Sequence, residues 1–137
     1  MSARTKARKR ALDILFSADL RGLPLSEVIE AEAQRAVGEP ERESSWLYAR
    51  DIVDGVNENL TAIDEAISAS SRGWTLERMP AVDRAILRLA AWEMLYNPEV
   101  PAAVVMSEAA ELATSLSTDD SASFVNGVLS AIANTSE

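Results

Sequence analysis

The amino-acid sequence predicts an all-α fold of about six or seven helices in two packed helical subdomains. Apolar residues recur at helical spacing along most of the chain, whereas the alternating pattern of a half-buried strand is scarce. A length of 137 residues with 47% hydrophobic residues suits one compact domain with a core. We expect a single domain, 1–137, whose N-terminal subdomain (about 1–72) packs against the C-terminal one (about 73–137), because neither half alone has much core.

Three helices are predicted for the first half of the chain. The first helix ends near 22–24. Its apolar stripe consists of Ala7, Ala11, Ile14, Leu15 and Ala18. A short second helix covers about 26–37 and is stopped by a glycine and a proline. The third helix is predicted to be the longest, about 41–70, because its apolar residues recur on one helical face both before and after Gly55.

The second half begins with a short helical turn at about 75–78, followed by a helix over about 80–97. Another helix is opened by Pro101, since proline is well tolerated in a first turn. The last helix is predicted to start at Asp119 or Asp120, because both side chains are good N-caps.

Glycine and tryptophan give two packing predictions. Gly127 stands inside the last helix, where glycine costs about 1 kcal/mol relative to alanine. A tight helix crossing at Gly127 is the simplest reason for accepting that cost. Trp46, Trp74 and Trp92 are predicted to anchor the core or the boundary between the subdomains.

Charge is distributed unevenly along the chain. Five of the first ten residues are basic and none is acidic: Arg4, Lys6, Arg8, Lys9 and Arg10. The whole chain has 13 basic and 22 acidic side chains, for a net charge of −9, so the remainder is strongly acidic. Phosphate contact depends on local potential, so this segment is either a docking point for RNA or a solvated tail.

A helical wheel places these basic residues around the first apolar stripe. Lys9 points away from the stripe, Lys6 and Arg10 lie on one flank, and Arg8 lies on the other. Arg4 falls close to the stripe, where it could not stay if it were buried. We therefore expect the first few residues to be frayed in the free protein.

Composition excludes several classes of function. The chain has no Cys and no His, which excludes disulfides, Cys/His zinc sites and catalytic Cys or His. It has no glycine-rich phosphate loop, and Glu108 with Glu111 gives only weak support for a carboxylate metal site. No apolar run is long enough for a membrane span or a signal peptide. We expect a cytoplasmic protein with no cofactor or metal and no catalytic Cys or His.

The two phenylalanines are candidates for partner contact. Phe16 lies opposite the first stripe, near Leu12 and Leu20, and is the best placed of the three for partial exposure. Phe124 is one position off the apolar stripe of the last helix. It is either a residue at the rim of the core or an exposed platform on which a base stacks.

Many separated blocks of this sequence resemble the NusB family, in the same order and over nearly the whole chain. They are Ala7-Arg8-Lys9-Arg10-Ala11-Leu12, Leu15-Phe16, Asp83-Arg84-Ala85-Ile86-Leu87-Arg88, Trp92-Glu93, Val100-Pro101, Glu108-Ala109, Glu111-Leu112-Ala113, Asp120-Ser121 and Phe124-Val125-Asn126-Gly127-Val128-Leu129. The region from about 23 to 43 matches least.

The resemblance implies a function and a set of partners. NusB-like proteins are all-helical transcription antitermination factors and not enzymes. They bind the boxA RNA of ribosomal RNA leaders as a heterodimer with NusE, a small-subunit ribosomal protein. The heterodimer joins an antitermination complex on RNA polymerase. We therefore expect boxA RNA, NusE and this assembly as partners.

The resemblance also implies which residues act. The basic opening of the family corresponds to Arg4, Lys6, Arg8, Lys9 and Arg10, which are expected to bind RNA. The aromatic of the last motif corresponds to Phe124 and the acid before its serine to Asp120, both expected at the RNA. The expected NusE contacts are Phe16, Glu77 and Asp83. Phe16 stands where a Tyr is common, so a hydroxyl contact there is lost while stacking is retained.

Other functions stay open at this point. One is a protein-only adaptor, or a homodimer that covers its own RNA site. Another is a module related to the N-terminal domains of ribosomal RNA methyltransferases, without a catalytic part.

Overall fold

The computed structural model describes residues 2–135, which form seven α helices, two short 3₁₀ helices and no strand. The all-α prediction is confirmed. The helices are α1 (Ala3–Arg21), α2 (Leu25–Val37), α3 (Glu43–Glu58), α4 (Leu60–Ser70), α5 (Ala81–Tyr96), α6 (Ala102–Leu116) and α7 (Asp119–Thr135). The 3₁₀ helices are η1 (Pro40–Arg42) and η2 (Leu76–Arg78).

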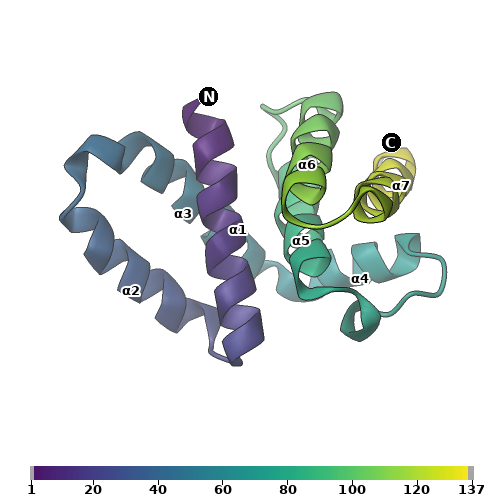
Figure 1. Cartoon of the computed structure of the whole chain (residues 1–137), viewed down its shortest axis with the longest axis horizontal. Coiled ribbons are helices and arrows are strands. Elements are labelled where there is room, and N and C mark those ends of the chain that lie inside the picture. Colours follow the sequence, from purple (N-terminus) through teal and green to yellow (C-terminus); the bar gives the residue numbers. More distant parts are fainter. Residues whose placement is uncertain (1, 136–137) are drawn as a thin grey trace.

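The helices form two groups that meet along α1 and α5. Figure 1 shows α2 and α3 on one side of α1, and α5, α6 and α7 on the other. α1 packs on α3 and α5, while α6 and α7 pack on each other and on α5. One continuous core of buried residues joins the groups. α4 packs on α5 and α7 and so joins the second group, although it precedes residue 72. The position of a subdomain boundary in the chain stays a prediction.

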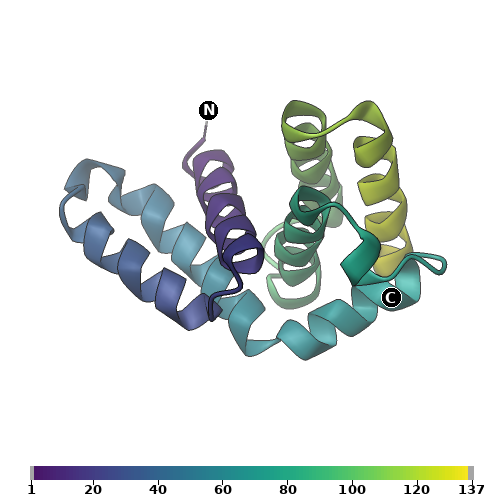
Figure 2. The same cartoon turned by 60° about the horizontal axis from the view of Figure 1, so that its bottom comes forward.

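The predicted long helix over 41–70 is wrong, because it breaks at Asn59. The backbone of Asn59 leaves the helical region, with φ −120° and ψ 21°. Its side-chain amide donates to the carbonyl oxygen of Gly55 at 2.8 Å, in competition with the backbone. α3 therefore ends at Glu58, and α4 leaves in a new direction that places it under α5 and α7, as Figure 2 shows.

The tight helix crossing lies at Gly55, not at Gly127. A Cβ built on Gly55 would stand 1.9 Å from Nε1 of Trp92, so the glycine lets the indole of α5 lie against α3. A Cβ built on Gly127 meets nothing within 4 Å, and Gly127 is exposed. The packing reason predicted for Gly127 is therefore wrong.

Local signals account for the ends of α1 and α7. The hydroxyl of Ser2 accepts a hydrogen bond from the Thr5 backbone N–H at 3.1 Å, and α1 is helical from Ala3. Gly22 ends α1 with φ +65°. At α7 the cap is Thr118, whose hydroxyl accepts from the Ser121 backbone N–H at 3.1 Å. The predicted caps, Asp119 and Asp120, instead occupy the first turn of α7.

Within residues 2–135, none of the helices has both the length and the apolar character needed to cross a membrane.

Candidate nucleic-acid interface

The basic residues of α1 divide into an exposed set and one buried residue. Lys6 and Lys9 are exposed, Arg10 is half-buried, and Arg4 is exposed. Arg8 is only 3% exposed. Because α1 is capped at Ser2, the expected fraying of the first residues is not found from residue 2 onward; Met1 lies outside the described residues.

Arg8 is held in a network of charges that joins α1 to α5 and α6. Its Nε and Nη2 donate to the two carboxylate oxygens of Glu93 at 2.7 and 2.9 Å. Its Nη1 donates to Glu108 at 3.2 Å. Burial lowers the pKa of Arg8, but the hydrogen bond of Glu93 together with the charges of Glu93, Glu108 and Tyr48 outweighs it and raises that pKa. Arg8 therefore cannot reach RNA from this position, which removes it from the predicted RNA contacts.

Tyr48 completes this network from α3. Its hydroxyl donates to Glu93 at 2.6 Å and accepts from the side-chain amide of Asn97 at 2.9 Å. Burial and the bond to Glu93 raise the pKa of Tyr48 to about 12. Arg4 stands over the Tyr48 ring, 4.4 Å from its centre, and pairs with Glu99 at 3.2 Å. Arg4 is thus held against α3 and the connection between α5 and α6, while its side chain stays exposed.

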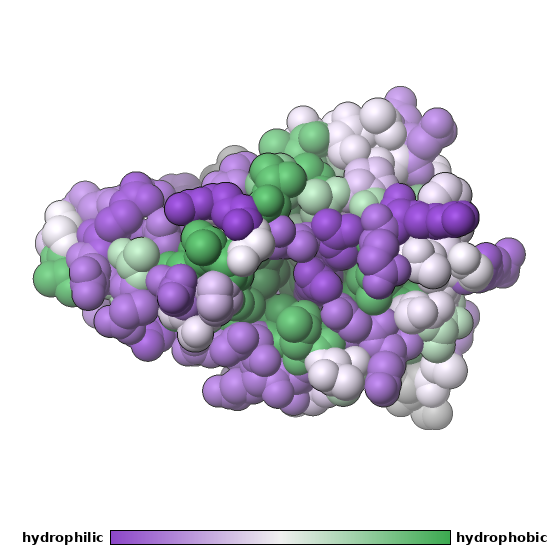
Figure 3. Space-filling view, turned by 90° about the horizontal axis from the view of Figure 1, so that it is seen from below, coloured by the Kyte–Doolittle hydropathy of each residue, from purple (hydrophilic) through white to green (hydrophobic). Residues whose placement is uncertain are grey.

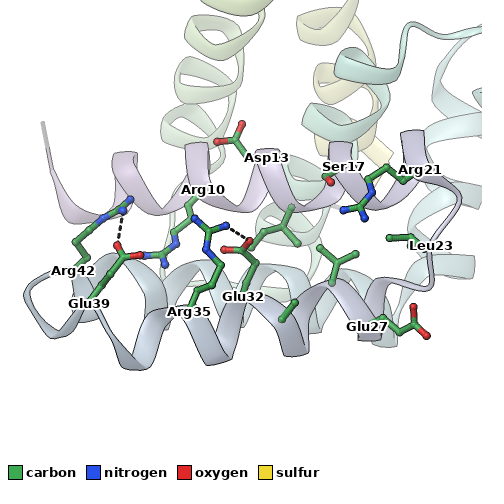
Figure 4. A pocket seen from close by; sticks show the side chains of 13 residues that line it. Arg10, Asp13, Ser17, Arg21, Leu23, Glu27, Glu32, Arg35, Glu39 and Arg42 are labelled. Atoms are coloured by element: carbon green, nitrogen blue, oxygen red, sulfur yellow. Dashed lines mark hydrogen bonds and ion pairs between the residues drawn. The ribbon is translucent and has the colours of Figure 1, made fainter.

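Arg10 reaches into the groove between α1 and the α2–α3 segment. Its guanidinium lies 5.1 Å from the centre of the Trp46 ring. Figure 4 shows this cavity of about 490 Å³, with Arg10 pointing from α1 toward Arg35 and Arg42. Nη1 of Arg10 is buried and has no hydrogen-bond partner within the described chain. Stacking on Trp46 therefore fixes a cation that keeps one donor free.

A second depression beside Arg10 gathers four cations from two segments. Lys6, Lys9 and Arg10 come from α1, and Arg42 comes from η1. Asp13 and Glu41 also line the depression and partly offset these charges. Lys9 donates to Asp13 at 2.8 Å, and Arg42 donates to Glu39 at 2.6 Å. Arg42 stands between two glutamates in the sequence, so it was not among the predicted RNA contacts. The exposed basic set thus continues from α1 toward the start of α3.

Phe124 lies with Trp74 at a second position. Their rings meet edge to face, with centres 6.2 Å apart. Trp74 is 53% exposed, so of the two places predicted for it, the core or the subdomain boundary, the core is wrong; Trp46 is buried and Trp92 half-buried. The two rings border a cavity of about 210 Å³, called here the Trp74 cavity. It is lined by Trp74, Met79, Pro80, Asp83, Thr118, Asp120, Ser121 and Phe124.

Asp83 lies at the inner side of the Trp74 cavity. It is only 2% exposed, and its Oδ2 accepts from the hydroxyl of Ser121 at 3.0 Å. Its Oδ1 is buried without a hydrogen-bond partner in the described chain. Burial raises the pKa of the Asp83 carboxyl. Asp83 therefore does not stand on an open surface, which corrects the expectation that it meets a protein partner there.

The other two expected protein-partner residues lie near the end of α1. Phe16 is half-buried against the core, and Glu77 is exposed on η2. Arg84 ties these elements together, because it donates to the backbone carbonyl of Leu76 at 2.7 Å and to Asp19 at 2.7 Å. These contacts hold η2 beside the C-terminal end of α1.

Leu20 adds an apolar residue to this region. It is 66% exposed and stands one helical turn after Phe16, although Phe16 was predicted to be the more exposed of the two. Seen from below in Figure 3, hydrophobic residues form separate patches among hydrophilic ones rather than one apolar face. A partner on this side would therefore meet small apolar anchors framed by polar groups.

The exposed basic residues of α1 and the Trp74 cavity are separated along the direction in which α1 and α5 run. α1 and α5 run side by side in opposite directions, since Arg8 meets Glu93 and Arg84 meets Asp19 (Figure 1). Asp83 precedes Glu93 by ten residues on α5, which is about 15 Å at 1.5 Å per residue. A ligand that touches both must be extended, as a nucleic-acid strand is.

Comparison with known proteins gives one consistent result. The model of the NusB family matches residues 5–134. The chain is 65% identical over 133 residues to the transcription antitermination protein NusB of Leifsonia xyli subsp. xyli, covering 97% of this chain and 92% of that protein. It is 53% identical over 132 residues to the protein of the same name from a Nocardioides species, covering 96% and 94%.

Solved structures agree with the sequence comparison. NusB of T. maritima superposes with a TM-score of 0.80 at 33% identity, covering 96% of this chain and 90% of that one. A chain from a crystal structure of the antitermination factors NusB and NusE in complex with dsRNA gives a TM-score of 0.83 at 28% identity, covering 98% of each. Fold, sequence and family model converge, and the chain belongs to the NusB family.

Proposed function

We propose that this chain is a transcription antitermination factor that binds boxA RNA together with NusE and joins the antitermination complex on RNA polymerase. The observation that carries the proposal is the exposed basic set on an otherwise acidic protein. Family membership supplies the expectation of antitermination, and a related chain has been solved with NusE and dsRNA. The role proposed is binding, with no catalytic step.

The proposed RNA surface consists of Arg4, Lys6, Lys9, Arg10 and Arg42, with Phe124 and Asp120 farther along the chain. Four of the cations border one depression or its neighbour, where a phosphate would meet more than one of them. Cations of this kind release counterions when they bind phosphates, so affinity must fall steeply with salt. Arg8 is left out, because its guanidinium is occupied by Glu93 and Glu108.

The proposed NusE surface lies around Phe16, Leu20 and Glu77. Exposed apolar and acidic groups stand together there, held by the Arg84 contacts to η2 and α1. Such a surface is complementary to a basic protein with small apolar anchors. Asp83 is not included as a direct contact, because it is buried.

The RNA surface is tested by titrating boxA RNA across a salt series in the presence of NusE. The triple variant Lys6→Gln, Lys9→Gln, Arg10→Gln should bind more weakly, and the slope of log affinity against log salt should fall by roughly 2, at about 0.7 per lost contact on single-stranded RNA. The control variant Arg50→Gln removes an exposed charge from α3, outside both depressions, and should leave the slope unchanged. Equal slopes for the triple variant and the wild type would refute the basic-set assignment.

The NusE surface is tested by analytical ultracentrifugation of the two proteins without RNA. The variant Leu20→Glu, Glu77→Lys should lose the heterodimer at micromolar concentration, while the basic triple variant keeps it. Failure of the wild type to form a heterodimer, or formation of a homodimer instead, would favour the adaptor or self-associating alternatives.

A further inference from the structure

A groove between α3 and the C-terminal end of α5 lies apart from the proposed NusE surface. It has a volume of about 670 Å³ and is called here the α3–α5 groove. Four carboxylates and a single arginine line it, so its charge is negative. The carboxylates belong to Asp51, Asp54, Glu58 and Glu99. Acids so placed repel phosphate, so the groove does not extend the RNA surface.

Three of these carboxylates form a row on one face of α3. Asp51, Asp54 and Glu58 are spaced i, i+3 and i+7, which brings them to the same side of the helix. Asp54 accepts from Arg50 at 3.3 Å, whereas Asp51 and Glu58 are exposed and form no ion pair within residues 2–135. The row is about 10 Å long, at 1.5 Å per residue. No three acids of the described chain are grouped so that they could hold a metal ion. The row is therefore suited to separate cations.

One end of the groove already holds a cation from the chain itself. The guanidinium of Arg4 lies 4.4 Å from the centre of the Tyr48 ring and pairs with Glu99 at 3.2 Å. An arginine thus finds both an aromatic face and a carboxylate in this groove. The same two kinds of group recur beyond Arg4, because Tyr96 is 41% exposed and lines the groove together with the acid row.

Trp92 adds a hydrogen-bond donor to the groove. Its Nε1 lies against Gly55, where a Cβ would stand only 1.9 Å away. This N–H makes no hydrogen bond within the described residues, and it is not among their fully buried unpartnered atoms, so it is accessible from the groove that Trp92 lines. An indole N–H can only donate, and a backbone carbonyl is a suitable acceptor. A ligand that offers both cations and a carbonyl is a basic peptide.

The length of the acid row matches an extended peptide, in which residues i and i+3 are about 10 Å apart. We propose that the α3–α5 groove docks an extended, arginine-containing segment of a partner protein other than NusE. Its guanidinium groups pair with Asp51 and Glu58 and stack on Tyr96, and one of its backbone carbonyls accepts from Trp92. The site lies at the end of α5, whereas the proposed NusE surface includes η2, which precedes the start of α5.

The probe is a short fluorescein-labelled peptide with arginine at every third residue and serine or glycine between. It is titrated by fluorescence anisotropy against the full chain, without RNA or NusE. The variant Asp51→Asn, Glu58→Gln should bind about fivefold more weakly, since two exposed ion pairs are lost. The control Glu30→Gln, Glu65→Gln makes the same change in net charge at exposed positions outside the groove and should bind like the wild type. Equal affinities of the two double variants would overturn the inference.

Two further measurements separate docking in the groove from general attraction to an acidic protein. A peptide with neutral citrulline in place of arginine should not bind, and a lysine peptide should bind about threefold more weakly, because an ammonium group does not stack on Tyr96 as a guanidinium does. In heteronuclear NMR spectra the indole N–H signal of Trp92 should shift during the arginine titration, while that of the buried Trp46 should stay in place. An unmoved Trp92 signal, or equal binding of the three peptides, contradicts the proposed contacts.

The same double variant distinguishes this site from the NusE surface. Asp51→Asn, Glu58→Gln should keep the heterodimer with NusE in analytical ultracentrifugation. Loss of the heterodimer would assign the groove to NusE and overturn the inference of a separate partner. Failure of the proposed function would be seen separately, because the peptide titration contains neither RNA nor NusE.

Discussion

Two buried acids on the same helix differ in their hydrogen-bond partners. Glu93 and Asp83 both lie on α5 and are 1% and 2% exposed. Both oxygens of Glu93 accept hydrogen bonds, from Arg8 and from Tyr48. Asp83 has no cation beside it; its neighbours are the hydroxyls of Ser121, at 3.0 Å, and Ser117, and one of its oxygens has no hydrogen bond within the described chain. Burial is the same for the two acids, and only the partners differ.

Because of this difference, Glu93 stabilises the fold and Asp83 does not. In a buried ion pair whose oxygens all accept hydrogen bonds, removing one partner lowers the free energy of unfolding strongly. Glu93, Arg8 and Tyr48 join α5, α1 and α3, so this network belongs to the fold. Asp83 has no such counterion, so its burial is a cost to the fold in place of a contribution to it. Each of the following variants tests one side of this contrast.

The largest effect is expected for Arg8→Met. Removing the cation leaves Glu93 buried without its counterion, which should lower the free energy of unfolding by about 3–5 kcal/mol. Urea denaturation measures it. The double variant Arg8→Met, Glu93→Leu should recover most of the loss, because a well-packed apolar pair often replaces a buried ion pair. A loss below about 1 kcal/mol in the single variant would show that the Arg8 network is not structural.

Tyr48→Phe should have the next largest effect, and it should depend on pH. The pKa of Tyr48 is about 12 in the folded protein, against an ordinary 10.0, so the fold favours the neutral phenol. This stabilisation is fully present below pH 10 and is lost as pH rises through 12. The variant should lose about 2 kcal/mol of unfolding free energy at neutral pH.

The pH dependence is checked by urea denaturation at a series of pH values from 9 to roughly 12, which gives the free energy of unfolding at each. Wild type should lose stability across the window from about 10 to 12 more steeply than Tyr48→Phe, which lacks the titrating group. The other tyrosine, Tyr96, is common to both proteins and provides the background. Parallel curves would mean that the Tyr48–Glu93 bond contributes little.

Asp83→Asn should have a smaller effect and the opposite sign. Because burial raises the pKa of Asp83, the fold favours its protonated form and the ionised form is a cost at neutral pH. The variant should therefore be more stable at neutral pH, by up to about 1 kcal/mol. The gain should shrink as pH falls through the folded pKa and vanish below the ordinary value. Thermal melts from neutral to acid pH measure it, and a variant less stable at neutral pH would remove the contrast with Glu93.

Sequence periodicity predicted the helices well where packing is local. The stripe of Ala7, Ala11 and Ile14 is buried, and the all-α class follows from such stripes. It failed at Asn59, because a helix can bend through one residue while the apolar phase continues on either side. It also placed the tight crossing at Gly127 instead of Gly55, because a glycine in a helix does not reveal which partner approaches it.

The site was harder to predict because its partners are distant in the chain. The wheel placed Arg8 on a flank of the stripe, but burial depended on Glu93, 85 residues away. Trp74 was expected to anchor the core or the subdomain boundary on its size alone, yet it lies between α4 and η2, meets only the edge of Phe124 and stays half exposed. The unpaired oxygen of Asp83 is a property of the packed structure and has no counterpart in sequence spacing.

Lys9→Gln should have the smallest effect on stability and gives the surface counterpart of Arg8→Met. Lys9 adjoins Arg8 in sequence, but it is exposed and pairs only with Asp13 on the same helix. Such a pair contributes about 0.3–0.5 kcal/mol, so urea denaturation should barely change. RNA binding should respond instead, with the salt slope falling by about 0.7. In Arg8→Met the salt slope should stay as in the wild type, because Arg8 faces Glu93. If Lys9→Gln destabilised the fold by more than about 1 kcal/mol, or if Arg8→Met flattened the salt slope, the separation between structural and RNA-facing cations along α1 would fail.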